Sequence, residues 1–417
     1  MTVHYNKPSP FLDWQLILLG LGILLFVNMN QLGRWTQAVD YSLYDNYLQI
    51  IPTSANDQIL IVEIDEQSLS LIGDWPWPRS YHAQLIEVLT QADAGVIAYN
   101  VVFSSYDSDD ENDQLLAQAI EESGRTILPL YFDRLIKQQA ISEVLPAESF
   151  RQYAGLGHVN SYLDSDGTLR SVRLMDRFSE TQWPHFSFSS FLFNQPYAKP
   201  LDSTSSDVYI PFVNQGDFER FSFVDVLTGL VSPQQLAQRT IFIGMTATSM
   251  GDPLLTPVDD HGRQSPAVDI NANIYQALAN DSLIKPLSTS LSILFNSIVL
   301  LVALYLIPRL SVIQQLVMTV TSFIFVWMAS YGLLLQGYWY SNGGLLLALL
   351  TVPFIWNLWR LSRLLNYFRH QLKRLRKSQG AEMFHLPEYV QLENEADLRS
   401  LLSLMDIDRF QLLPANQ

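Results

Sequence analysis

The chain of 417 residues contains no cysteine. Disulfide bonds, thiolate zinc sites and cysteine nucleophiles are therefore excluded. Basic residues are also scarce, with 25 Lys and Arg against 41 Asp and Glu and a formal net charge of −16. Because nucleic acids are bound through a basic surface, we expect no nucleic-acid partner. Charged residues make up only 16% of the chain and hydrophobic residues 48%, which is unusually apolar for a soluble protein.

Four apolar segments account for this composition. One lies at residues 11–30, and three follow a long acidic region, at residues 287–307, 312–335 and 340–359. Each is close to the roughly 20 residues that cross a bilayer as a helix, and the three later segments contain no Asp, Glu, Lys or Arg. We expect four transmembrane helices. For the first segment a cleaved signal peptide is the alternative, although residues 26–29 lack its small-residue cleavage pattern.

The distribution of Lys and Arg predicts the orientation of these helices. A dense basic cluster follows residue 359: Arg360, Arg363, Arg369, Lys373, Arg374, Arg376 and Lys377. Such clusters stay in the cytoplasm. We therefore expect a multi-pass protein of the inner membrane, with residues 1–10 and 360–417 in the cytoplasm and residues 31–286 in the periplasm. Residues 31–286 carry a net charge of −19 and the rest of the chain +3, which agrees with an acidic exported domain on a membrane anchor.

Within the exported domain, short apolar runs alternate with amphipathic stretches. The runs predict strands at 59–65, 95–103, 126–132, 169–175, 208–213 and 240–245, and the amphipathic stretches predict helices at 80–92, 112–122 and 270–279. Strands separated by a helix pair in parallel through right-handed crossovers. The expected fold is α/β, a mixed and mostly parallel sheet with flanking helices, joined to one transmembrane helix before it and three after it.

Several motifs in this domain are similar to one known family. They are Asp65 followed by Trp75-Pro76-Trp77-Pro78-Arg79, then Gly157-His158-Val159-Asn160, Asp164-x-Asp166-Gly167-x-x-Arg170 and Gly244-Met245-Thr246-Ala247. Together they resemble the type-two CHASE domain, a cyclase/histidine-kinase-associated sensory extracellular domain. The resemblance covers residues 35–290 and implies a membrane-bound sensor with one helix before the domain and three after it. Asn100 departs from the family, which has Asp there.

Five residues form the candidate ligand site. Asp65, at the end of one expected strand, and Asn100, near the end of the next, flank the loop that carries Trp75, Trp77 and Arg79. Ligands of open α/β sheets bind beyond the carboxyl ends of the strands, so we expect these side chains to meet in one crevice. The alternative is structural: Asp65 caps the following turn and pairs with Arg79, while the two tryptophans only pack.

No motif predicts a metal, a cofactor or catalysis. The segment Asp164-Ser165-Asp166-Gly167 resembles the start of a calcium loop, but the twelfth position is Met175 and not a carboxylate, so a β-turn is expected. The acidic run at 107–113 is expected as a solvated loop before a helix, and the histidines lack ligand spacing. Without a nucleophile elbow or a phosphate loop, we expect a protein that is not an enzyme.

The tail after residue 359 has two apolar features. Leu361, Leu365, Phe368, Leu372 and Leu375 follow heptad spacing and predict either the stem of a parallel homodimer or a helix lying on anionic membrane lipid. Both interpretations stay open. Leu398, Leu401 and Leu402 predict an amphipathic helix that docks a cytoplasmic signalling partner, or else the remnant of an output domain.

The residues after 378 are too few for the cyclase or kinase domain that this family commonly carries. We therefore expect a sensor or regulator whose exported domain detects a ligand or a protein and whose output passes to a separately encoded cytoplasmic partner. The alternative is a scaffold subunit of an envelope complex that binds another exported protein without signalling.

Overall fold

The computed structural model describes residues 20–29, 36–51, 53–105, 110–135, 140–178, 180–196, 207–214, 216–248, 250–251, 253–258 and 264–381. The chain divides into two compact units. The α/β unit comprises Ala38–Pro286 together with Leu333–Tyr340, and the helical unit comprises Met1–Gln37, Leu287–Gly332 and Ser341–Gln417. The α/β unit thus contains a segment that lies between two of the long apolar helices.

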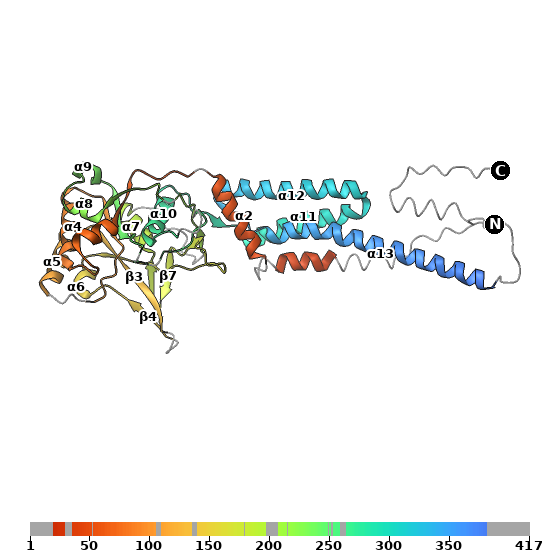
Figure 1. Ribbon diagram of the computed structural model, residues 1–417, viewed down its shortest axis with the longest axis horizontal. Coiled ribbons are helices and arrows are strands. Elements are labelled where there is room, and N and C mark those ends of the chain that lie inside the picture. The colour runs from red at the N-terminus through yellow and green to blue at the C-terminus, as the bar shows by residue number, and fades with distance from the viewer. Residues whose placement is uncertain are drawn as a thin grey trace. The chain divides into compact units, whose positions relative to one another are not determined.

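The α/β unit is built on a seven-stranded sheet (Figure 1). Its strands are β1 (Ile59–Ile64), β2 (Val96–Tyr99), β3 (Thr126–Leu135), β4 (Ala140–Val144), β5 (Gly155–His158), β10 (Glu219–Ser222) and β11 (Thr240–Met245). The order is β10-β1-β11-β2-β3-β4, with β5 also on β3. Every pair is parallel except β3 with β4. The expected mostly parallel sheet is confirmed, although the strand expected at 95–103 ends at Tyr99.

Helices cover both faces of this sheet. One face packs against α3 (Glu66–Ile72), α4 (Arg79–Gln91), α5 (Asp110–Ser123), α6 (Glu148–Arg151), α8 (Phe223–Leu227) and α9 (Pro233–Leu236), and the other against α7 (Phe186–Asn194) and α10 (Ala267–Ala279). Alternate residues of β1 enter the two cores, with Leu60 and Val62 in the first and Ile59 and Ile61 in the second. A strand buried on both faces reads as a continuous apolar run, which is the pattern of this segment.

Two motif glycines bring the second helix layer close to the sheet. A Cβ atom on Gly157 of β5 would lie 2.5 Å from the Cα atom of Phe186, and one on Gly244 of β11 would lie 2.7 Å from the Cβ atom of Val268. No larger residue fits at either position without a shift of the helix. The motifs around 157 and 244 therefore include packing requirements of α7 and α10.

A second, smaller set of paired strands completes the α/β unit, and we call it the short ladder. It comprises β6 (Ser171–Val172), β9 (Val208–Tyr209), Ile284 with β12 (Lys285–Pro286), and β13 (Tyr338–Trp339). β6 pairs with β9, Tyr209 of β9 bridges to Ile284, and β12 pairs with β13. The six-residue strand expected at 208–213 was wrong, since only two of its residues form a strand. The strand expected at 169–175 is divided between β6 and the β7 (Met175–Phe178)–β8 (Thr181–Pro184) hairpin.

The helical unit contains α11 (Thr289–Leu306), the 3₁₀ turn η1 (Ile307–Arg309), most of α12 (Val312–Leu335) and α13 (Gly343–Ala381). Three segments are long and apolar enough to cross a membrane: Thr289–Arg309, Val312–Leu335 and Gly343–Arg374. A shorter apolar helix, Gly20–Met29, covers part of the span expected at 11–30, and its Asn28 side chain donates to Ser297 Oγ at 3.1 Å.

The apolar residues of the expected stem lie on α13, which continues without a break beyond residue 359. Leu361, Leu365, Phe368 and Leu372 are all exposed, as both interpretations of this stem require. Leu398, Leu401 and Leu402, the expected docking residues of the tail, lie outside the described part of the chain.

Candidate functional site

Asp65 caps the helix that follows the first strand. Its Oδ1 atom accepts hydrogen bonds from the Ser68 backbone N–H and from the Ser222 hydroxyl, both at 2.8 Å. These contacts join β1, α3 and β10, and capping satisfies one of the free N–H groups at the start of α3. The structural alternative was right about the cap and wrong about the partner, because Asp65 does not pair with Arg79.

The other predicted residues surround a buried histidine, His82 of α4. Trp75 and Trp77 pack against its ring at centroid distances of 5.5 and 6.2 Å, and the Tyr99 hydroxyl lies 2.6 Å from its Nδ1 atom. Arg79 lies over the Phe103 ring at 4.6 Å and faces Asp113, with Nε and Oδ1 3.8 Å apart. This strand-end cluster is filled by its own aromatic side chains.

Asn100 is partly exposed directly after β2, and its backbone N–H donates to Ile243 O at 2.7 Å. All five predicted residues thus follow the carboxyl ends of β1 and β2. Asp65 forms the cap of α3, Trp75, Trp77 and Arg79 lie around His82 and Phe103, and Asn100 contacts β11. Whether these residues bind a ligand stays a prediction.

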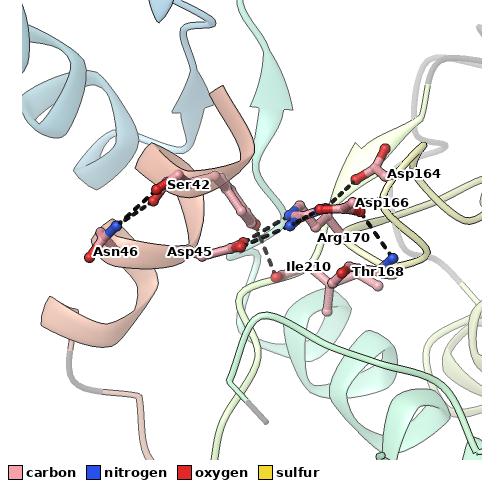
Figure 2. Close-up of polar contacts among 9 residues, drawn as sticks. Ser42, Asp45, Asn46, Asp164, Asp166, Thr168, Arg170 and Ile210 are labelled. Atoms are coloured by element: carbon pink, nitrogen blue, oxygen red, sulfur yellow. Dashed lines mark hydrogen bonds and ion pairs between the residues drawn. The ribbon is translucent and has the colours of Figure 1, made fainter. Parts of the chain in front are cut away.

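Among the described residues, the largest cluster of ion pairs lies elsewhere, around Arg170 at the start of the short ladder (Figure 2). Its side chain is 2% exposed, and all five of its N–H donors are used. Two go to Asp45 of α2 (Gln37–Ile50) at 2.8 Å, two to Asp166 at 2.8 and 2.9 Å, and one to Asp164 at 3.0 Å. The Tyr41 ring covers the guanidinium at 4.3 Å. Arg170 therefore joins α2 to the turn at 164–167.

The three carboxylates of this cluster differ in electrostatic environment. Burial raises the pKa of Asp164 in spite of its contact with Arg170. Hydrogen bonding to Arg170 lowers the pKa of Asp166, which is more exposed. Burial acts to lower the pKa of Arg170, but its hydrogen bonds to Asp45 and Asp166 outweigh this and raise it. The guanidinium is therefore charged at every physiological pH, and three carboxylates depend on it.

A tryptophan from the joint between two apolar helices completes the site. Trp339 of β13 is 4% exposed and packs against Tyr44, Tyr47 and Tyr209 at centroid distances of 5.0, 6.2 and 6.2 Å. The Tyr44 hydroxyl donates to Ile210 O at 3.1 Å. α2, β9 and β13 are thus held around one aromatic side chain.

Backbone hydrogen bonds connect these two clusters. Ile210 N donates to Arg170 O at 3.0 Å, Tyr209 and Ile284 exchange two bonds at 2.8 and 3.0 Å, and Lys285 N donates to Gly337 O at 2.8 Å. Each strand at the far end of this ladder adjoins an apolar helix in sequence: β12 precedes α11, and β13 connects α12 to α13. Backbone hydrogen bonds therefore connect the Arg170 segment to the strands that adjoin three of the long helices in sequence.

The Arg170 and Trp339 clusters hold distant segments of the chain together. In the described ranges no group of three or more His, Asp or Glu side chains is placed to hold a metal ion. The clusters instead consist of satisfied ion pairs and aromatic contacts between segments distant in sequence.

Sequence reasoning missed most of this site. The residues 164–170 were interpreted as a turn leading into a strand, which is correct locally, since Gly167 N donates to Asp164 O at 2.9 Å. The partner Asp45 lies in α2, which no pattern predicted. One signal was available: three consecutive aromatic residues, Tyr338, Trp339 and Tyr340, at the point where the segment expected at 340–359 begins.

The comparisons with known proteins give one result. The model of the CHASE2 domain family matches residues 18–307, which is more than half of the chain and includes the whole sheet, α2, β12 and α11. No curated protein and no solved structure matches the chain.

Proposed function

Because the chain belongs to the CHASE2 domain family, whose domain is sensory, we propose that it is a sensor of the bacterial inner membrane. In this proposal the α/β unit lies in the periplasm and detects a ligand or an exported protein. The segments 11–30, 289–309, 312–335 and 343–359 cross the membrane, and both termini lie in the cytoplasm. A sensory family is compatible with a protein that has no catalytic activity of its own.

The observation that carries the proposal is the position of Trp339. A sensor needs its exported domain to change the state of its membrane helices, and this requires an element whose arrangement differs between two states of different ligand affinity. Trp339 belongs to the joint between α12 and α13, yet it is buried in the α/β unit among Tyr44, Tyr47 and Tyr209. A change in the α/β unit that moves these tyrosines acts directly on the joint.

Beyond the membrane, the proposal places the output in the tail. α13 continues to Ala381 as one helix, so a rotation or a shift of its start is carried to the basic segment after residue 359. Leu398, Leu401 and Leu402 are proposed to dock a cytoplasmic signalling partner, and the exposed stripe from Leu361 to Leu372 is proposed either as a homodimer stem or as a lipid-facing surface.

The test uses a chimera in which an adenylate cyclase catalytic domain replaces the residues after Arg374, so that output can be measured without knowing the native partner. Trp339→Ala should change cyclic AMP production, because it removes the contact that couples the joint to the α/β unit. Phe188→Ala is the matched control, since Phe188 on α7 is equally buried, at 5% exposure, and belongs neither to the short ladder nor to the predicted ligand site. Both changes should cost about 3–5 kcal/mol of folding stability, but only Trp339→Ala should change the output.

The scaffold alternative predicts a different result. If the α/β unit only binds another exported protein, both variants leave cyclic AMP production at the wild-type level per molecule of accumulated protein. Equal changes in the two variants would show that output follows stability and not the joint, and this would also contradict the proposal.

A further inference from the structure

The part of α13 beyond residue 359 carries an exposed apolar stripe. Leu361, Leu365, Phe368 and Leu372 are 52, 49, 42 and 64% exposed, and their spacings of four, three and four residues place them on one face of the helix. α13 extends past the ends of α11 and α12 (Figure 1). At 1.5 Å per residue, Leu372 lies about 20 Å along the helix axis beyond residue 359. Because the proposed membrane span ends at residue 359, most of the stripe faces water, which is unfavourable.

The charges around this stripe are all positive. Residues 360–381 contain seven Lys and Arg and no Asp or Glu. Arg369 and Lys373 directly follow Phe368 and Leu372 in sequence, so both adjoin the same edge of the stripe. A segment that covers this surface should therefore present apolar side chains bordered by carboxylates.

The tail of the same chain has this character. Residues 382–417 contain seven Asp and Glu and two Arg. Their apolar residues include a set with the spacing of one helix face, and an Asp adjoins each end of this set: Asp397, Leu398, Leu401, Leu402, Met405 and Asp406. The tail lies outside the described part of the chain, so the match is one of sequence. An apolar face with acidic borders corresponds to an apolar stripe with basic borders.

The connection between the two segments is long enough for them to meet. Leu365 precedes Ala381 by 16 residues, a distance of about 24 Å along a helix. The 16 residues from 382 to 397 can span up to about 50 Å when extended. A segment tethered in this way has an effective concentration in the millimolar range, so a contact with an intrinsic Kd of about 0.1 mM is closed about nine-tenths of the time.

We propose that the tail segment 393–408 docks on the stripe of α13 in the same molecule, with its apolar face on the stripe and its carboxylates beside Arg369 and Lys373. The regulatory consequence rests on the proposed function. Leu398, Leu401 and Leu402 cannot contact the stripe and a cytoplasmic partner at the same time. A movement of α13 that opens this contact therefore releases the tail to the partner, and the closed contact is autoinhibitory.

The test measures how fast a water-soluble maleimide labels a single cysteine in the full chain, in nanodiscs of phosphatidylcholine and phosphatidylglycerol that hold one chain each. Because the chain has no cysteine of its own, Leu372→Cys places the probe on the stripe. Labelling should become about tenfold faster when Leu401→Ser and Leu402→Ser open a contact that is closed nine-tenths of the time. His370→Cys, on the opposite face of the helix, is the matched control, and the tail changes should leave its labelling rate unchanged.

Charge reversal tests which surfaces meet. On the native stem, a tail with Asp397→Lys and Asp406→Lys should protect the cysteine at position 372 less than the native tail does. On a stem with Arg369→Glu and Lys373→Glu the order should reverse, so that the lysine-bearing tail protects and the native tail does not. Each comparison is made on one stem, so the effect of neighbouring charges on the thiol cancels.

The proposal is overturned if the tail changes do not alter labelling of Leu372→Cys, or if charge reversal of the stem does not reverse the order. Slow labelling with every tail would show that lipid covers the stripe, and fast labelling with every tail that nothing does. Protection that appears only in nanodiscs holding two chains would assign the stripe to a second copy. Because no signalling output is measured, failure here leaves the sensor proposal standing, and failure of the sensor proposal leaves the contact standing.

Discussion

The strand-end cluster around His82 and the short ladder around Arg170 and Trp339 both bury polar groups among aromatic rings within one α/β unit. They differ in how far apart in sequence their residues lie. The strand-end cluster is built mostly from nearby residues, with Trp75, Trp77, Arg79 and His82 within eight positions. The ladder and the α2 residues packed against it come from five distant segments, near residues 45, 170, 209, 285 and 339. The strand-end cluster adds Tyr99 and Phe223 from further along the chain, whereas the ladder depends on all the segments that adjoin the apolar helices in sequence.

The two parts also differ in what they adjoin. The strand-end cluster lies where α/β sheets place ligand sites, and the ladder adjoins the helices in sequence. The ladder consists of two-residue strands, which contribute few hydrogen bonds each and depend on the side-chain clusters for their stability. Such an element is suited to have two arrangements of similar free energy.

The largest expected effect comes from removing the cation of the ladder. Arg170→Met leaves the partly buried carboxylates of Asp45, Asp164 and Asp166 close together without their cation, and the loss of one partner of a buried ion pair costs about 3–5 kcal/mol. We expect the melting temperature of the full chain, followed by tryptophan fluorescence, to fall by about 10 °C.

Asp65→Ala is the comparison variant. It removes only a helix cap from the strand-end region and should lower the free energy of unfolding by about 1 kcal/mol. If Arg170→Met melts at the wild-type temperature, or no lower than Asp65→Ala, then the ladder does not depend on its ion pairs as proposed.

A slightly smaller effect is expected from acid pH, which should destabilise the sheet before it destabilises the ladder. Burial lowers the pKa of His158 on β5 to about 4, and burial, with the nearby charge of His158, lowers the pKa of His185 well below its ordinary value. Each group has a depressed folded-state pKa, so its neutral form stabilises the fold fully above about pH 6.5, and this stability is lost as the pH falls toward 4. For His158 alone the loss amounts to about 3 kcal/mol.

In the ladder, the stabilising charge of Asp166 should be lost only at lower pH, because its depressed pKa keeps this charge until the pH falls below the ordinary value for a carboxyl group, about 3.9. The raised pKa of Asp164 acts in the opposite direction and does not add to the decline. We therefore expect His158→Leu to flatten the decline of melting temperature between pH 6.5 and 4. An unchanged decline would show that groups other than His158 control acid stability in this range.

Much of the sheet could be predicted from the sequence, and the ladder could not. β1 and β11 are continuous apolar runs with turn residues around them, and burial on both faces leaves few alternatives to a central strand. β6, β9, β12 and β13 have two residues each, too few to show any periodicity. Their pairing depends on the contacts of Arg170 and Trp339. Arg170 and its partner Asp45 are 125 residues apart, and Trp339 and its partner Tyr44 are still further apart along the chain.

The candidate site divides in the same way. The predicted residues Asp65, Trp75, Trp77, Arg79 and Asn100 do follow the ends of β1 and β2, because strand ends can be read from apolar runs. The pairing of Asp65 with Arg79 could not be checked from spacing, and it was wrong: Ser222, on a strand whose neighbour is β1 only in space, is the partner of Asp65.

The most direct test of the coupling role locks the ladder. Lys285 and Tyr338 are paired neighbours of β12 and β13, and adjacent strands are spaced within the range that a disulfide bridges. In this naturally cysteine-free chain, Lys285→Cys with Tyr338→Cys gives one reversible crosslink in the cyclase chimera. Asp45→Asn, which weakens the Arg170 cluster, serves as the input, and Arg177→Cys with Gln182→Cys on the β7–β8 hairpin is the control crosslink.

If the ladder carries the signal, Asp45→Asn changes cyclic AMP production while the β12–β13 crosslink is reduced, and the change disappears when the crosslink forms but persists with the control crosslink. The same effect of Asp45→Asn with the β12–β13 crosslink open and closed would contradict the account.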